Sequence, residues 1–321
     1  MSIAGGPIRL RFAGEELLEA IHPPFAHLDI AGAAPETEIC VFEGRRSGVE
    51  APPIPEVASV ESGAANPIAR YQGEDATVLA GLRTGELTAS LGDGSRAILY
   101  VPDPSAIPAS DWVGRFRGAL MLVLAPRGLR LLHAGAVGAA GRGALISGRS
   151  GSGKTTLSVA CALAGMEICA DDYVVLGEDE PPVVHALQST AAVSEKSAGM
   201  LGLAAPGPPP AGFEATLGGP PKAPVDLRRL APAGLTSRLA VGALVVPLRS
   251  GIAKPVLRRV SGARGLQSLA PSTVFQQLPR DEGLLGAMGR LVSRLECFEL
   301  ELSADTEANA AAVREVVDGL D

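Results

Sequence analysis

Apolar and polar residues alternate over short stretches in the first third of the chain, which predicts strands about five residues long. Residues 111–124 differ, because apolar residues recur there every three or four positions, and this spacing predicts a helix. Pro126-Arg127-Gly128 ends that pattern. The predicted strands of this part are 8–12, 37–42, 77–82, 87–91 and 96–101, and a short helix is predicted at 14–21.

The rest of the chain mixes apolar strand patterns with longer helical ones, which predicts an α/β arrangement. We place the domain boundary after residue 127, with a small N-terminal α+β module at 1–127 and a second domain at 128–321. The predicted strands are 129–137, 143–147, 167–172, 173–176, 183–187, 240–248, 255–261 and 296–302, the two at 240–261 paired with each other. The predicted helices are 155–163, 193–201, 271–278, 281–294 and 305–320, the last capped by Asp305. Segments 45–67 and 204–224 are rich in Pro and Gly and are expected to be loops.

Composition narrows the function classes. The chain has 321 residues, of which 46% are hydrophobic and 3% aromatic, and its net charge is −7. A nucleic-acid partner is not expected, because such proteins carry a basic face. A membrane partner is not expected either, since apolar stretches such as 118–125 are far too short to cross a bilayer. Residues 1–12 lack the apolar segment of a secretory signal, so we expect a cytoplasmic protein.

One glycine-rich run carries recognisable chemistry. Residues 148–155 read Gly-Arg-Ser-Gly-Ser-Gly-Lys-Thr and fit the phosphate-binding loop, with a predicted strand before the run and a predicted helix after it. Its glycines allow backbone N–H groups to turn toward a phosphate, its lysine reaches the β- and γ-phosphates, and its threonine can ligate Mg²⁺. The predicted nucleotide-binding residues are Gly148, Ser150, Gly151, Ser152, Gly153, Lys154, Thr155 and Thr156. An ordinary glycine-rich turn is the alternative.

Two adjacent carboxylates, Asp171 and Asp172, end the apolar strand predicted at 167–172. A kinase needs one carboxylate to help hold Mg²⁺ and a base to accept the proton of the attacking hydroxyl. Neighbouring strand residues point to opposite sides, so the pair can divide these tasks. A solvated turn is the alternative interpretation.

Three segments together resemble the catalytic core of HPr kinase/phosphorylase: residues 132–135 (Leu-His-Ala-Gly), the phosphate loop, and residues 169–172 (Cys-Ala-Asp-Asp). His133 precedes Gly148 by fifteen residues and Asp171 follows Lys154 by seventeen, spacings that match that family. ATP-using phosphoenolpyruvate carboxykinase is a more distant relative. Residues 269–276 and 296–300 resemble HPr-kinase-like serine kinases found with peptide-natural-product pathways, lasso peptides included. The resemblance covers about residues 129–302.

The resemblance implies a P-loop kinase core of the HPr kinase/PEP carboxykinase type, a mixed sheet with flanking helices, using ATP and Mg²⁺. It implies that Asp171, His133 and Lys154 are catalytic: Asp171 as general base, His133 beside the γ-phosphate and Lys154 on the phosphates. Thr155 and Asp172 would hold Mg²⁺, although the two aspartates could exchange roles and His133 could be an ordinary strand histidine.

The function expected from this resemblance is transfer of the γ-phosphoryl group to a serine hydroxyl of a peptide or small protein, with a lasso-type precursor as one option. The N-terminal module is expected to help recognise the acceptor, and a homo-oligomer is left open. The Glu-Ile-Arg-Gly-Leu-Gly signature of HPr kinase/phosphorylase is absent, which leaves open both phosphorylase activity and the cation that clamps the phosphates: Lys196, Lys222 or Arg249. The alternatives are a nucleotide-binding sensor or scaffold without transfer activity, and a kinase of a small molecule such as free serine.

Overall fold

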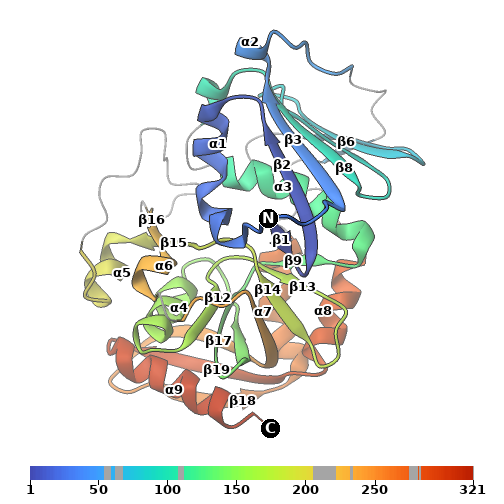
Figure 1. Ribbon diagram of the computed structural model, residues 1–321. Coiled ribbons are helices and arrows are strands. Elements are labelled where there is room, and N and C mark those ends of the chain that lie inside the picture. Colours follow the sequence, from blue (N-terminus) through green and yellow to red (C-terminus); the bar gives the residue numbers. More distant parts are fainter. Residues whose placement is uncertain are drawn as a thin grey trace. The chain divides into compact units, whose positions relative to one another are not determined.

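The computed structural model describes residues 1–53, 59–61, 68–107, 112–204, 222–231, 234–274, 281 and 283–320, and every count below refers to these residues. The chain forms two compact units. The first holds Met1–Arg130 and Asp281, and the second holds the other described residues after Arg130. Each unit is a mixture of helices and strands, so the fold is mixed α/β (Figure 1).

The first unit holds an eight-stranded sheet in the order β1-β2-β3-β8-β7-β6-β5-β4. β2, β3 and β8 run parallel, and the other neighbours are antiparallel. The strands are β1 (Ser2–Ile3), β2 (Gly6–Phe12), β3 (Thr37–Glu43), β4 (Ser59–Glu61), β5 (Ile68–Gln72), β6 (Ala76–Gly81), β7 (Leu87–Leu91) and β8 (Arg96–Val101). The helices are α1 (Glu15–Ile21), η1 (Pro23–Leu28), α2 (Gly44–Ser47), η2 (Pro104–Ala106), α3 (Trp112–Leu124) and η4 (Ala125–Arg127).

The helix α3 anchors the core of this unit. Its spacing of apolar residues buries Trp112, Phe116 and Leu120 along one side. The Phe116 ring meets Phe25 of η1 edge-on, with the ring centroids 5.1 Å apart. Alternation predicted β2, β3, β6, β7 and β8 to within two residues, and the recurrence of apolar residues every three or four positions predicted α3. The strands β1 and β5 were missed, and the segment predicted as a loop at 45–67 contains most of α2 and all of β4. Residues 54–58 and 62–67 of that segment lie outside the described residues.

The second unit holds a nine-stranded sheet in the order β12-β10-β11-β17-β14-β13-β9, in which β19 also pairs with β17 and β18 with β19. Its strands are β9 (Arg130–Leu132), β10 (Gly135–Ala139), β11 (Arg142–Ile146), β12 (Glu167–Ala170), β13 (Val174–Leu176), β14 (Val183–Ala186), β17 (Arg238–Ile252), β18 (Val256–Val260) and β19 (Glu296–Ser303). A separate two-stranded sheet pairs β15 (Thr190–Ser194) with β16 (Lys222–Asp226) in antiparallel orientation. The helices are α4 (Lys154–Leu163), α5 (Glu195–Met200), α6 (Leu227–Leu230), α7 (Gly262–Val274), α8 (Leu284–Val292) and α9 (Thr306–Asp318).

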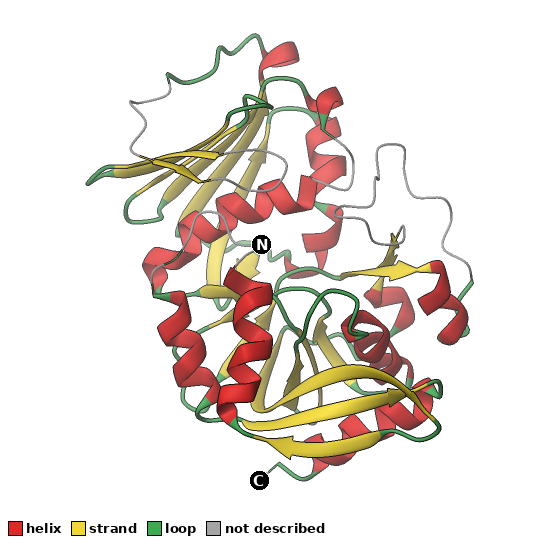
Figure 2. Cartoon of the chain, turned by 180° about the vertical axis from the view of Figure 1, so that it is seen from behind, coloured by secondary structure: helices red, strands yellow, loops and turns green. Residues whose placement is uncertain are grey.

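Helices cover both faces of this sheet, which Figures 1 and 2 view from opposite sides. α4 and α9 share a core with Ala243 and Val245 of β17. α7 lies against the opposite face, where its Gly265 is next to Leu244 and Cys297. Asp305 caps α9, as predicted, because its carboxylate accepts a hydrogen bond from the Ala308 N–H at 2.9 Å.

The predicted pairing of 240–248 with 255–261 is wrong. β19 lies between the two strands, parallel to β17 and antiparallel to β18. The physical reason is burial: β19 buries Cys297 and Leu300, whereas every residue of β18 is exposed or half-buried and suits an edge.

Three further predicted elements differ from the structure. The strand predicted at 129–137 is two strands, β9 and β10, with His133 between them. The helix predicted at 193–201 is the end of β15 followed by α5. The helix predicted at 271–278 is the end of α7, and its residues 275–278 lie outside the described residues. The loop predicted at 204–224 is wrong at its end, because residues 222–224 begin β16 and pair with β15, and its residues 205–221 lie outside the described residues. Within the described part of the chain, no helix combines the length and the apolar character needed to cross a membrane.

Candidate functional site

The glycine-rich run connects the end of β11 to the start of α4, so it lies at one edge of the sheet. The backbone at Gly153 has φ +106°, and a Cβ there would lie 2.7 Å from Leu302 Cδ1, so only glycine fits. The first backbone hydrogen bond of α4 runs from the Leu157 N–H to the Gly153 carbonyl at 2.9 Å. The N–H groups of the first turn therefore have no acceptor within the helix, which makes this turn attractive to an anion.

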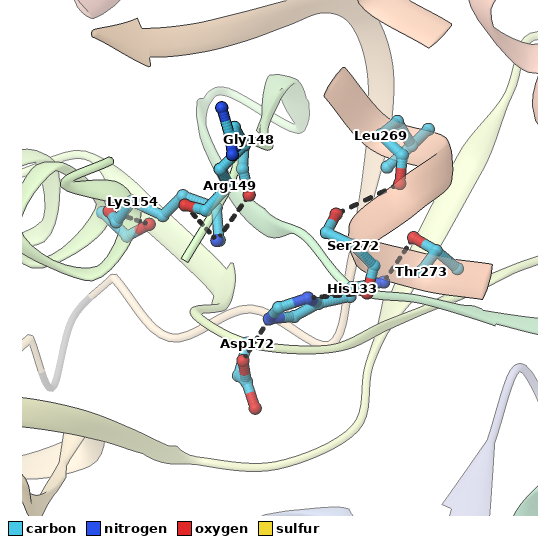
Figure 3. A network of polar contacts seen from close by, with 9 residues as sticks. His133, Gly148, Arg149, Lys154, Asp172, Leu269, Ser272 and Thr273 are labelled. Atoms are coloured by element: carbon cyan, nitrogen blue, oxygen red, sulfur yellow. Dashed lines mark hydrogen bonds and ion pairs between the residues drawn. The ribbon is translucent and has the colours of Figure 1, made fainter. Parts of the chain in front are cut away.

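Lys154 lies inside the loop (Figure 3). Its Nζ donates to the carbonyl oxygens of Gly148 at 2.7 Å and Arg149 at 3.3 Å, and the residue is only 9% exposed. Burial lowers the pKa of the ammonium, while the negative charges of Asp172 and Asp171 act in the opposite direction. The loop thus encloses a positive charge that two carboxylates favour.

Asp171 follows β12 directly and is 2% exposed. Among the described residues its Oδ1 has no hydrogen-bond partner. Burial, reinforced by the charge of Asp172, raises the pKa of Asp171 to about 6, although hydrogen bonds with Thr155 and Ser158 and the charge of Lys154 oppose that rise. Asp171 is therefore a better proton acceptor than an ordinary aspartate and still ionises near neutral pH.

His133 is fixed on several sides, and Asp172 is one of its partners (Figure 3). Its Nε2 lies 2.8 Å from Asp172 Oδ1, and its Nδ1 lies 3.1 Å from the Ser272 carbonyl oxygen. The His133 backbone N–H donates to Thr273 Oγ1 at 3.2 Å, and the Tyr173 ring stacks on the imidazole with centroids 5.0 Å apart.

These contacts fix the orientation of the His133 ring. The Ser272 carbonyl oxygen and the Asp172 carboxylate lie at opposite nitrogens of the ring. The ring therefore links the carboxyl end of α7, which supplies Ser272, to Asp172.

Gly135 allows β10 to lie close to α4 and to the end of β12. A Cβ on Gly135 would lie 2.6 Å from Ser158 Oγ and 3.0 Å from the Asp171 carbonyl oxygen. β10 can therefore pass close to both α4 and the end of β12 only without a side chain at this position. Because His133 lies two residues before Gly135, this close packing also places it at the same edge of the sheet as the phosphate loop and the two aspartates.

The remaining predicted residues occupy different surroundings. Thr155 is half-buried and adjoins Asp171, whereas the Thr156 hydroxyl donates to Ser197 Oγ at 2.9 Å and so points toward α5. Ser150 is exposed, and Ser152 Oγ is buried without a hydrogen-bond partner among the described residues. Of the clamp candidates, Lys222 acts electrostatically on Lys154, the Nε of Arg249 lies 3.9 Å from a Cβ built on Gly153, and Lys196 is an exposed residue of α5.

Sequence reasoning missed three residues of this network: Ser158, Ser272 and Thr273. The signal for Ser158 was its place one turn after Lys154 on the predicted helix. Ser272 and Thr273 lie about 140 residues from His133, and no local pattern predicts that contact.

The donor set fits Mg²⁺ as a partner of bound phosphate. Hydroxyl and carboxylate oxygens such as those of Thr155, Asp171 and Asp172 are the ligands that Mg²⁺ prefers, and Asp171 Oδ1 still lacks a partner among the described residues. The described residues contain no group of three His, Cys, Asp or Glu side chains that could hold a metal ion. Mg²⁺ does not require one, because it is commonly held by one or two carboxylates together with phosphate oxygens.

Comparisons with known proteins add little. No family model matches the chain, and no curated protein matches it. Among solved structures, the chain is similar to the Hpr(Ser) kinase/phosphatase from Coxiella burnetii at 11% identity, over 54% of this chain and 85% of that one, with a TM-score of 0.30. A likeness that weak supports no conclusion about activity, so the function rests on the residues of the site.

Proposed function

We propose that this protein is an ATP-dependent kinase that transfers the γ-phosphoryl group to a serine hydroxyl of a peptide or small protein. The observation that carries the proposal is Asp171, a buried carboxylate with a pKa raised to about 6 beside the hydroxyl of Thr155 at the start of α4. A perturbed carboxylate next to a phosphate-binding loop is typical of a catalytic base, and a structural carboxylate would normally have its hydrogen bonds satisfied.

In this proposal each group has one task. The N–H groups of the loop and Lys154 bind the β- and γ-phosphates. The serine Oγ forms a bond to Pγ, the bond from Pγ to the β,γ-bridging oxygen breaks, ADP leaves, and the hydroxyl proton passes to Asp171. His133 lies beside the transferring group and orients Asp172 through its 2.8 Å contact.

Thr155 and Asp172 would hold Mg²⁺, which when bound neutralises charge on the phosphates. Asp171 is then left to serve as the base. In the alternative assignment the two aspartates exchange roles, with Asp172 as the base and Asp171 as the Mg²⁺ ligand. The two assignments differ in which aspartate is needed for phosphate transfer and which one is needed for the effect of Mg²⁺ on nucleotide binding.

The acceptor is proposed from the resemblance of residues 269–276 and 296–300 to serine kinases of peptide-natural-product pathways. A lasso-type precursor peptide is therefore the first acceptor to test. We also propose that the N-terminal module, residues 1–127, contributes to acceptor recognition.

The test is transfer of radiolabelled γ-phosphate from ATP to a panel of serine peptides in the presence of Mg²⁺. Asp171→Asn should lower kcat by roughly 100- to 10,000-fold, because it removes the base. Asp179→Asn, at an exposed carboxylate of the same unit, serves as the matched control and should transfer at the wild-type rate. Undiminished transfer by Asp171→Asn would eliminate Asp171 as the base. Tight ATP binding by a wild-type protein that phosphorylates no acceptor would favour the sensor or scaffold alternative.

A further inference from the structure

The two-stranded sheet of β15 and β16 packs against α4 and is hydrogen-bonded to its first turn. In the second unit, β15, β16, α5 and α6 gather beside α4 (Figure 1). Ala191 and Val193 of β15 are buried in the same core as Leu157 and Cys161 of α4. Apolar packing therefore holds one side of this two-stranded sheet, which limits how far the ends of its strands can move.

Hydrogen bonds between hydroxyl groups also connect one end of this two-stranded sheet to α4. Thr156 Oγ1 donates to Ser197 Oγ at 2.9 Å, and Ser194 Oγ lies 3.0 Å from the same oxygen. The Ser197 N–H donates to Ser194 Oγ at 3.2 Å, so Ser194 caps α5. Ser194 is thereby fixed near the amide groups at the start of α4.

Lys222 of β16 lies directly opposite Ser194 of β15 in the antiparallel pair. It therefore lies at the same end, on the side of the phosphate loop. Its positive charge acts on Lys154, where the charges of Asp172 and Asp171 also act. The electrostatic effects of Lys222 and of two carboxylates thus meet at the ammonium group of Lys154.

Lys222 also lacks a competing ion pair. It is exposed, and no carboxylate of the described residues forms an ion pair with it. The other end of β16 is different, because Asp226 is paired with Arg228 at 2.8 Å. Lys222 and Lys154 repel each other, and a bound polyanion would offset that repulsion.

We propose that Lys222 binds the γ-phosphate of the nucleotide together with Lys154, so that the site distinguishes a nucleoside triphosphate from a diphosphate. This inference rests on the nucleotide site of the proposed function. An ammonium on a flexible stem suits this task, since it can follow the γ-phosphoryl group as that group moves toward the acceptor.

The test measures the Kd of ADP and of a non-hydrolysable ATP analogue, both with Mg²⁺, and so needs no knowledge of the acceptor. Lys222→Ala should weaken binding of the analogue by about tenfold, the usual effect of losing one charge-assisted hydrogen bond, and should leave ADP binding unchanged. Lys222→Arg keeps the charge and should retain most of the preference. Lys254→Ala is the matched control: it removes the same charge from another exposed residue of the second unit and should leave both values unchanged.

Equal losses for ADP and the analogue, or no loss for either, would overturn the role of Lys222. The outcome is separable from that of the proposed function. If Lys222→Ala removes the triphosphate preference but the wild type transfers phosphate to no acceptor, the inference stands and the kinase proposal fails. If the wild type transfers phosphate and Lys222→Ala keeps the wild-type preference for the triphosphate, the kinase proposal stands and the role of Lys222 is refuted. A wild-type protein that binds neither nucleotide would refute both.

Discussion

The two units bury charged groups in opposite ways. In the first unit, Arg115 of α3 forms an ion pair with Glu86, so a half-buried positive charge meets a half-buried negative one. In the second unit, Asp171 is buried beside a second carboxylate, and its pKa rises as a result. A paired charge is an ordinary packing solution, whereas a buried carboxylate with a raised pKa destabilises the fold and is typical of a functional site. Under the proposed function, the charged pair of the first unit serves packing, and Asp171 of the second unit serves chemistry.

The largest effect is expected in the core of the first unit. Phe116→Ala removes a fully buried ring and its edge-on contact with Phe25, which should lower the free energy of unfolding by about 3 to 5 kcal/mol. Chemical denaturation followed by circular dichroism measures this loss. Leu18→Ala, at a residue of the same unit that is 40% exposed, is the control and should have little effect. A loss of stability no greater for Phe116→Ala than for Leu18→Ala would contradict the packing described for α3.

The next effect has the opposite sign and lies in the second unit. Asp171→Asn should raise the free energy of unfolding at pH 7.5 by on the order of 2 kcal/mol, measured without added Mg²⁺ or nucleotide. The folded-state pKa of about 6 lies above the ordinary value of 3.8, so between these values the folded protein binds more protons than the unfolded chain. Wild-type stability therefore falls as the pH rises through this window, and the Asn variant escapes that loss.

The pH dependence provides the check on this interpretation. The gain from Asp171→Asn should shrink toward zero as the pH falls from 7.5 to 4, because wild-type Asp171 is then protonated in the folded state. Asp179→Asn, at an exposed position, should show no such change with pH. If the wild-type protein is as stable as Asp171→Asn at both ends of this range, Asp171 is not an uncompensated buried carboxylate.

The smallest effect sharpens the comparison within the second unit itself. Asp305 is also a carboxylate, but it accepts the Ala308 N–H at the start of α9. Asp305→Ala should therefore lower the free energy of unfolding by about 1 kcal/mol, whereas Asp305→Ser keeps the cap and should lose little. Thermal unfolding of the two variants beside the wild type measures the difference. Equal stability of the Ala and Ser variants would show that the cap contributes nothing.

Local patterns predicted much of this protein. Alternation predicted β3, β7 and β8 to within a residue, and the spacing of apolar residues predicted α3 and α4. The phosphate loop and the position of Asp171 and Asp172 at a strand end were also visible as short motifs. Such features depend on backbone conformation and side-chain periodicity over fewer than about fifteen residues, which is why residue order alone reveals them.

Contacts between distant segments followed no such pattern. Nothing near His133 in the sequence indicates that Ser272 and Thr273 would hold it, and nothing near β18 indicates that β19 would pair with it in place of β17. These arrangements depend on which surfaces are buried once several elements pack together. The same is true of Asp171, since its raised pKa comes from complete burial beside Asp172. Residue order therefore specified the chemical groups and the local elements that carry them, whereas packing set their partners and charge states, because both burial and the electrostatic field come from segments far apart along the chain.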